Sequence, residues 1–191
     1  GTGIAVINEF KNKIYAVWND TAGSAPKMFV YNNASDYWWD GRADGEDRAI
    51  GAHGSDSFGV PEQVTDSLNF TDRSNNNYLV LAHYDSSDSG YSYATVPSYD
   101  GTNPAAWTND AKDTKYLAEW DGKLWGISYA GQLWHAITPG TETDDALLPL
   151  PEGYVTGLFV ARDTRGEPIL YAATKQGLWA HDAMHAKFVQ T

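Results

Sequence analysis

Residues 114–136 read TKYLAEWDGKLWGISYAGQLWHA, and this stretch predicts the fold. It contains three short apolar and aromatic runs, which are separated by Asp121-Gly122 and by Ala130-Gly131. An Asp-Gly pair between two β-prone runs is the strongest short-range signal for a β-hairpin. The stretch is therefore predicted to form a meander of three antiparallel strands.

The composition of the whole chain agrees with an all-β protein. The 191 residues include 8 Trp, 12 Tyr and 6 Phe. Aromatic residues together with many Gly, Thr, Ser and Asn residues favour strands that are joined by tight turns. The length is sufficient for a sizeable core, and a single domain is expected.

The charge and the cysteine content exclude several classes of partner and site. The formal net charge is -12, so nucleic acid is not expected as a partner, because its phosphates would be repelled. An anionic membrane surface is disfavoured for the same reason. No apolar run approaches the roughly 20 residues that a membrane span needs, so membrane insertion is not expected. The chain has no cysteine, which excludes disulfides and thiolate zinc sites.

The meander has counterparts along the chain at a spacing of about 45 residues. Trp125 and Tyr171 are 46 residues apart, and Val80 precedes Trp125 by 45 residues. A further copy around Tyr15 precedes Val80 by 65 residues. The surplus of about 20 residues falls in the polar, Gly-rich segment 41–59, which is expected to be a loop insertion.

Each of the four copies is predicted to contain four strands. The first strands are expected at 4–7, 67–71, 116–120 and 156–161, and the fourth strands at 37–39, 105–107, 146–148 and 187–189. Four strands per unit at this period are typical of a β-propeller. The segment 180–186 is compatible with one helical turn or with a loop.

We therefore expect an all-β protein, a β-propeller of four-stranded antiparallel blades. Approximate blade boundaries are 1–43, 65–110, 114–150 and 153–191. A β-sandwich is the alternative. Since propellers have about 4–8 blades, the chain is expected to be a closed four-bladed ring, to close through a partner chain, or to be an incomplete segment of a larger propeller. The incomplete segment is favoured slightly.

Residues 86–93 read SSDSGYSY. This segment resembles the Asp-box of sialidases and related propellers, Ser-x-Asp-x-Gly-x-Thr-Trp, although Ser and Tyr stand in the last two positions. The resemblance implies a hairpin turn motif and not a catalytic site. The positions that would carry it are Ser86, Asp88, Gly90 and Tyr93. The segment lies between the second and third predicted strands of its unit, whereas the family has its box between the third and fourth.

A sialidase-type active site requires an arginine cluster, a Tyr nucleophile and a Glu partner. The five arginines fall in predicted loops or turns at unrelated positions of the repeat. A sialidase site is therefore not expected, and no catalytic residue is nominated. The sequence also lacks a Gly-x-Ser-x-Gly elbow, a phosphate loop and a dinucleotide fingerprint.

Acidic residues crowd one Gly-rich loop, at Asp40, Asp44, Glu46 and Asp47. Carboxylates at such close spacing could bind Ca²⁺. The order DGRADGED is not the EF-hand pattern, however, and a solvated acidic loop is the alternative. No other cofactor is expected.

The five histidines do not form a metal-binding pattern. His181 and His185 are four residues apart, a spacing that would place them on one face only in a helix. The repeat places His181 at the end of a strand instead. Both are expected to be surface residues in a loop.

Aromatic residues recur at equivalent positions of the repeat, which predicts packing between neighbouring blades. These residues are Trp125, Trp134, Tyr171 and Trp179.

Three consecutive aromatic residues, Tyr37, Trp38 and Trp39, differ from this pattern, because they cannot all face one side of a strand. At least one of them is expected to be exposed. It would lie beside Asp36 or Asp40 and could form a platform for a sugar ring or a partner protein.

The last two units resemble known propeller repeats. Residues 166–191, GEPILYAATKQGLWAHDAMHAKFVQT, resemble the blades of sensor-type and other bacterial propellers. Residues 116–136 are similar to repeats of large propeller proteins of tailed bacteriophages and their environmental relatives. The resemblance covers roughly the last 80 residues well and the first 110 loosely. It implies the architecture and suggests a location on a virion or a cell surface.

A fold does not determine a function, so two candidate functions are compared. The first is a non-catalytic binding or structural module, extracellular or on a virion surface, that mediates attachment to a protein or a glycan. Further propeller blades or copies of the chain itself are additional expected partners. The alternative is a carbohydrate-active propeller, either a lectin or a sialidase- or glycosidase-like enzyme, whose remaining blades are absent from this chain.

Overall fold

A computed structural model describes residues 3–10, 13–19, 27–32, 37–39, 63–85, 90–96, 108–110, 112–149 and 154–191. All regular structure in these residues is β-strand, so none of the described residues belongs to a helix that could cross a membrane. The strands form four sheets of four, and every pair of neighbouring strands is antiparallel and consecutive in sequence.

We refer to the four sheets as blades 1 to 4, in chain order. Blade 1 contains β1 (Gly3–Phe10), β2 (Lys13–Asn19), β3 (Lys27–Asn32) and β4 (Tyr37–Trp39). Blade 2 contains β5 (Gln63–Thr71), β6 (Asn77–Asp85), β7 (Gly90–Val96) and β8 (Thr108–Asp110). Blade 3 contains β9 (Tyr116–Trp120), β10 (Lys123–Ile127), β11 (Gln132–Ala136) and β12 (Thr143–Leu147). Blade 4 contains β13 (Val155–Arg162), β14 (Pro168–Thr174), β15 (Gly177–Asp182) and β16 (Lys187–Gln190).

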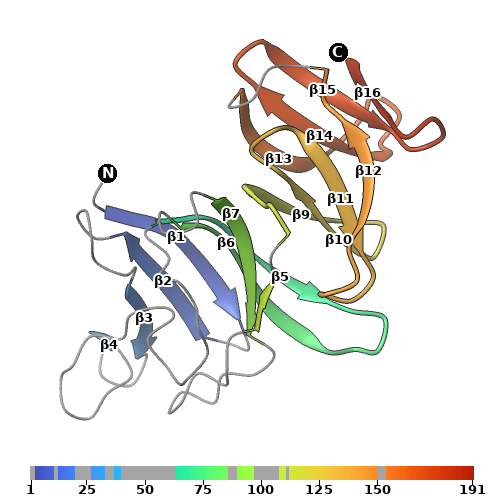
Figure 1. The fold of residues 1–191 in the computed structure, drawn as a ribbon. Helices are drawn as coiled ribbons and strands as arrows, with labels where there is room; N and C mark the ends of the chain where they lie inside the picture. Colours follow the sequence, from blue (N-terminus) through green and yellow to red (C-terminus); the bar gives the residue numbers. More distant parts are fainter. Residues whose placement is uncertain are drawn as a thin grey trace.

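The blades are arranged in an open arc (Figure 1). Their first strands, β1, β5, β9 and β13, each pack against the next along the arc. The arc runs from blade 1 at the lower left of Figure 1 to blade 4 at the upper right, and it does not close. This is the arrangement of a partial β-propeller, so the prediction of four-stranded antiparallel propeller blades is confirmed.

The hairpin predicted at Asp121-Gly122 is also confirmed. The φ angle is 52° at Asp121 and 64° at Gly122, and Trp120 pairs with Lys123 across the turn. Two consecutive residues with positive φ form a type I′ turn, whose twist matches that of the flanking strands. This turn joins the first two strands of blade 3.

In blades 2 and 4 the first two strands are joined instead by a longer turn that an aspartate closes. The carboxylates of Asp72 and Asp163 each accept hydrogen bonds from the backbone N–H groups two and four residues later, at 2.8 to 2.9 Å. These turns share one hydrogen-bonding pattern although their sequences differ. Hydrogen bonding lowers the pKa of both carboxyls, with the Asn76 side chain as the main cause at Asp72.

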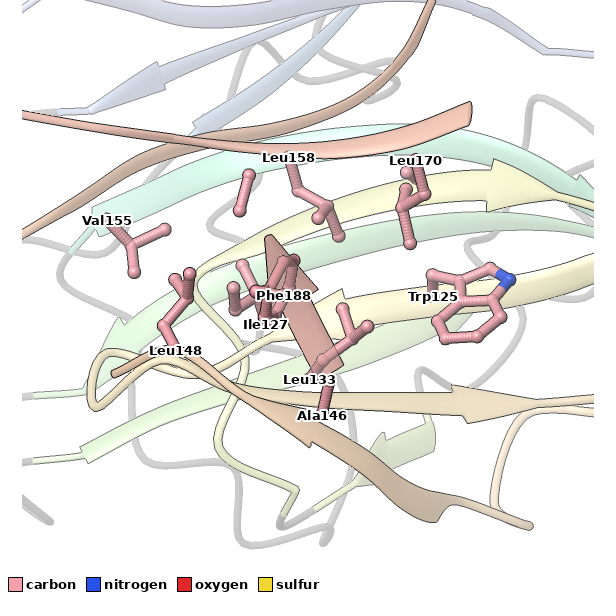
Figure 2. Close-up of a cluster of buried hydrophobic side chains, with 11 residues drawn as sticks. Trp125, Ile127, Leu133, Ala146, Leu148, Val155, Leu158, Leu170 and Phe188 are labelled. Atoms are coloured by element: carbon pink, nitrogen blue, oxygen red, sulfur yellow. The ribbon is translucent and has the colours of Figure 1, made fainter. Parts of the chain in front are cut away.

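Apolar side chains fill the space between neighbouring blades. A cluster between blades 3 and 4 is shown in Figure 2, where Trp125, Ile127 and Leu133 of blade 3 lie close to Leu158 and Leu170 of blade 4. A second cluster joins blades 2 and 3. Its buried members are Phe70, Val80, Ala82, Tyr93, Leu117, Leu124, Trp134 and Ala136. The prediction that the recurring aromatic residues Trp125 and Trp134 pack between blades agrees with these clusters.

Polar side chains near the inner strands add hydrogen bonds between blades. The Asn19 amide at the end of β2 accepts a bond from the Val64 N–H at 2.9 Å and donates to the Val64 carbonyl at 3.0 Å. The Asp66 carboxylate accepts from the Leu117 N–H at 2.9 Å. Blades 1 and 2 are therefore each bound to the backbone of the following blade.

Most predicted strands agree with the structure. The first strand predicted at 116–120 is β9, and those predicted at 4–7, 67–71 and 156–161 lie within β1, β5 and β13. The predicted fourth strands 37–39 and 187–189 correspond to β4 and β16. The segment 180–186 is not helical, since it forms the end of β15 and the turn that follows.

Two predicted fourth strands differ from the structure or lie outside it. The strand predicted at 146–148 is β12, which begins at Thr143, because the polar residues Thr143 and Asp144 pair with His135 and Trp134. An outer strand of this kind carries no apolar signal at its start. The strand predicted at 105–107 and the insertion 41–59 lie outside the described residues, and β8 begins at Thr108.

The closest packing in blade 3 lies between Gly126 and Trp134, which pair across β10 and β11. Both are buried, and the Trp134 ring also stacks on Tyr93 of blade 2 with 5.2 Å between centroids. A Cβ atom at position 126 would lie 2.2 Å from the Trp134 ring. The ring therefore occupies the volume that any side chain at this position would need.

Replacing Gly126 by Ala is expected to destabilise the protein by about 1–3 kcal/mol, the usual cost of overpacking a core. Gly157→Ala is the matched control, because its new Cβ would meet only the Ala173 side chain, at 3.8 Å. Urea unfolding followed by tryptophan fluorescence measures both variants. Equal stability of the two variants would contradict the close packing of Gly126 against Trp134.

Candidate functional site

The binding platform predicted from sequence lies largely outside the described residues. Tyr37, Trp38 and Trp39 form β4, the outermost strand of blade 1, and nothing is described of their side chains. Asp36 and Asp40 beside them lie outside the described residues, as do Asp44, Glu46 and Asp47 of the predicted Ca²⁺ loop. Both sites remain predictions.

The segment that resembles an Asp-box lies in the hairpin between β6 and β7. Ser86 and Asp88 are outside the described residues, and Gly90 begins β7. Tyr93 is fully buried, and its hydroxyl donates to the Glu142 carboxylate and accepts from the Gly140 N–H at 3.0 Å. Tyr93 is thus a packing residue at the contact between blades 2 and 3.

A row of tyrosines lies at the hairpin end of blades 2 and 3. Tyr84 at the end of β6 pairs with Tyr91 at the start of β7, and their ring centroids are 5.0 Å apart. Tyr91 stacks on Tyr129, which lies in the turn after β10, with 5.4 Å between centroids and 9° between the ring planes. The row therefore crosses from one blade to the next. Tyr129, at one end of the row, is 38% exposed.

Lys115 lies beside this row and contacts three blades. Its carbonyl accepts a hydrogen bond from the Thr65 hydroxyl of blade 2 at 2.8 Å. Its ammonium group donates to the Val155 carbonyl of blade 4 at 2.9 Å. The same ammonium lies 5.1 Å from the centroid of the Tyr129 ring and 5.3 Å from that of Tyr116. We call Tyr84, Tyr91, Tyr116, Tyr129 and Lys115 the tyrosine–lysine face.

Burial raises the pKa of two tyrosines of this face and lowers the pKa of its lysine. Burial raises the pKa of Tyr91, and the neighbouring Tyr129 and Tyr84 raise it further. Burial also raises the pKa of Tyr116, with a contribution from Asp66. The pKa of Lys115 is lowered by burial and by Lys175.

The chemistry of this face suits a ligand that has a flat apolar side and polar groups at its edge. A partly exposed aromatic ring offers apolar area at little cost in conformational entropy. A phenol hydroxyl donates and accepts hydrogen bonds, and an ammonium group is a strong donor to oxygen. A sugar ring has both kinds of surface.

Sequence reasoning did not single out the tyrosine–lysine face, although one signal was present. Tyr84 and Tyr129 are 45 residues apart, the period of the repeat, so they occupy equivalent positions in blades 2 and 3. Recurring aromatic residues predict inter-blade packing in strand centres. At the hairpin end of a blade, the same recurrence produces a partly exposed row.

A second group of polar side chains lies between the outer strands of blades 3 and 4. The Asp145 carboxylate contacts His181 Nε2 at 2.7 Å and His135 Nδ1 at 3.5 Å. The His181 ring also lies 5.2 Å from the ring of Trp125. The described residues contain no group of three or more His, Asp or Glu side chains that is arranged to hold a metal ion.

The structure corrects the prediction that both His181 and His185 are at the surface. His185 is exposed, and its Nδ1 contacts the Asp182 carboxylate at 2.7 Å. His181 is buried, so the prediction is wrong for this residue. The reason is that β15 continues to Asp182 and pairs His181 with Phe188, which lies in the core between blades 3 and 4.

Comparison with known proteins supports the fold alone. No protein-family model matches the sequence, and no curated protein matches it. Two crystal structures of the extracellular domain of one B. thetaiotaomicron protein, described as a hybrid two-component system in one and as a one-component system in the other, align with 99% of this chain. Their TM-scores are 0.54 and 0.55, at 14% sequence identity. The chain spans about a fifth of their length (21%).

A third similar structure is an α-L-arabinofuranosidase from Podospora anserina in complex with cellotriose. It is 15% identical, with a TM-score of 0.41, and the alignment covers 100% of this chain and 67% of the enzyme.

Lowering the pH from 7 to 5 is expected to destabilise the protein in part through His135. Burial and the neighbouring Lys123 lower the pKa of His135 in the folded state, against a smaller opposing effect of Asp145. The unfolded chain therefore binds more protons than the folded chain around the ordinary His pKa of about 6.5, and stability is lost as the pH falls through it.

His135→Gln is expected to reduce this pH dependence, because it removes the titrating group. His185→Gln is the control, since His185 is exposed on the turn between β15 and β16. Urea unfolding at pH 7 and pH 5 measures the effect. If the two variants lose the same stability on acidification, His135 does not contribute to it.

Proposed function

We propose that this chain is a non-catalytic β-propeller binding module that holds a glycan on the tyrosine–lysine face. The observation that carries the proposal is the stack of Tyr91 on Tyr129 beside the Lys115 ammonium. The stack joins two blades and leaves Tyr129 partly exposed. The ring stack and the hydrogen bonds of Lys115 pre-organise this platform for a ligand.

The contacts of Lys115 support a positioning role in this site. Hydrogen bonds to blades 2 and 4 fix its backbone and its ammonium group. Its ammonium has three donors, and one of them is used by the Val155 carbonyl. In the proposed complex another donor binds a hydroxyl or carboxylate oxygen of the sugar while the Tyr129 ring covers the apolar side.

We further propose that the module acts outside the cell, on a cell or virion surface, where it mediates attachment. The similar B. thetaiotaomicron structures are described as extracellular domains, and this agrees with the proposal. The resemblance of residues 116–136 to phage propeller repeats favours the virion. The acidic chain, with a formal net charge of -12, suits a soluble surface-exposed module.

The second candidate is a carbohydrate-active propeller, either a lectin or a sialidase- or glycosidase-like enzyme. The enzyme would require catalytic groups from blades absent from this chain. Product analysis of every glycan that binds separates the two proposals, because a binding module leaves its ligand unchanged. Release of a sugar by the chain itself would overturn the non-catalytic proposal.

The platform of Tyr37, Trp38 and Trp39 beside Asp36 and Asp40 is proposed as a second contact for a glycan or protein partner. Trp38→Ala and Trp39→Ala are expected to weaken such binding without unfolding the protein.

The acidic loop after this platform is proposed to bind Ca²⁺, which calorimetric titration with CaCl₂ tests directly.

Tyr129→Ala is expected to weaken glycan binding about two- to tenfold, since one aromatic contact contributes about 0.5–1.5 kcal/mol. A glycan array identifies a bound sugar, and calorimetry with that sugar measures the change in Kd. Tyr129→Phe is the matched control, because it keeps the stacked ring and removes only the hydroxyl. Met184→Ala, at an 86% exposed position on blade 4, controls for remote effects.

Equal loss of affinity in Tyr129→Phe and Tyr129→Ala would show that the ring itself does not bind the sugar. Unchanged affinity in Tyr129→Ala would place the binding site elsewhere on the chain.

A further inference from the structure

The outer face of blade 4, which points away from blade 3, is apolar and open. The side chains on this face come from all four strands and pair with one another across the sheet. They are Phe159, Ile169, Tyr171, Ala173, Leu178, Ala180 and Val189. Phe159, Leu178 and Val189 are 38%, 41% and 46% exposed. Phe159 and Tyr171 stack on each other, with 5.8 Å between ring centroids.

The same face is buried in every other blade. Tyr15, Val80, Trp125 and Tyr171 occupy one position of the repeat, on the second strand of blades 1 to 4. The first three are 2%, 0% and 3% exposed, and Val80 and Trp125 belong to the clusters that join their blades to the next one. Tyr171 is only half-buried. Blade 4 therefore presents one side of an inter-blade contact whose other side is missing.

Blade 1 presents the complementary side of such a contact at the other end of the arc. Ile4 and Ile7 of β1 lie beside Ala16 and Trp18 of β2, on the face opposite to the buried Tyr15. Ile4, Ile7, Ile14 and Trp18 are 57%, 59%, 42% and 41% exposed. In blades 2 to 4, the corresponding face packs against the preceding blade.

We propose that two copies of this chain associate head to tail, so that the outer face of blade 4 of each copy packs on the outer face of blade 1 of the other. The contact repeats the packing that already joins each pair of neighbouring blades within one chain. Because one chain carries both complementary faces, the contact is heterologous, and two such contacts close a ring. The bound state places the tyrosine–lysine faces of both copies at the same end of the ring.

Charge opposes this association at low ionic strength. Each copy has a formal net charge of -12, and two copies repel each other. The central side chains of both faces are uncharged, so salt screens the repulsion without weakening the apolar contact. The dimer is therefore expected to become more stable as NaCl is raised from about 20 mM to 500 mM.

Sedimentation velocity of the chain across a concentration series and at both salt concentrations tests the proposal. The expected result is a dimer of twice the 21.0 kDa mass, favoured by salt. A chain that stays monomeric at every concentration and salt overturns the proposal.

Two charged variants distinguish head-to-tail pairing from other dimers. The pair Tyr171→Lys and Leu178→Lys blocks the face of blade 4, and the pair Ile7→Lys and Trp18→Lys blocks the face of blade 1. Either double variant alone is expected to be monomeric. An equimolar mixture of the two is expected to form a heterodimer through the one intact contact that remains.

Met184→Lys adds the same kind of charge at an exposed turn and is expected to leave the dimer intact. Thermal unfolding checks that the double variants remain folded, as expected for changes on the outer faces of the two terminal blades. A dimer that survives either double variant overturns the proposal. A mixture that forms no heterodimer also overturns the proposal. Pairing between like faces would leave the two variants with no intact contact to share.

Discussion

The packing of apolar side chains between neighbouring sheets holds this structure together. A single four-stranded blade with apolar residues on both faces cannot bury them alone, so each blade depends on the next. Trp134 shows how specific this packing is, since its ring lies against Gly126 of its own blade and Tyr93 of the blade before it. The same requirement explains why the two ends of the arc expose isoleucine, tryptophan, phenylalanine and leucine side chains.

The candidate site follows from this architecture. The buried clusters between blades use the strand centres, whereas the hairpin ends make a partly exposed contact. Tyr84 and Tyr129 repeat at these ends, and Tyr91 bridges them, so that a row forms across two blades. Lys115 lies at the inner end of the same region, where three blades meet. In the proposed complex, a ligand at this face contacts side chains of more than one blade.

The fold could be predicted from the sequence because the repeat recurs at nearly constant spacing and the Asp121-Gly122 turn is local. The start of β12 could not, because its polar residues pair by backbone hydrogen bonds that leave no apolar pattern. The burial of His181 was missed for a related reason. Asp145, its partner, lies 36 residues away on another blade, and only the three-dimensional structure brings the two together. The tyrosine–lysine face likewise depends on contacts between blades.

The hydrogen bonds between blades have a consequence for the evolution of such a chain. Asn19 and Asp66 bind backbone N–H groups of the following blade, and Lys115 binds a backbone carbonyl. Backbone groups are the same whichever side chain follows them, so these contacts survive substitution of the residues that they touch. Blades joined in this way can be duplicated, exchanged or diverged with their alignment preserved. Substitutions at the hairpin ends leave these hydrogen bonds between blades in place.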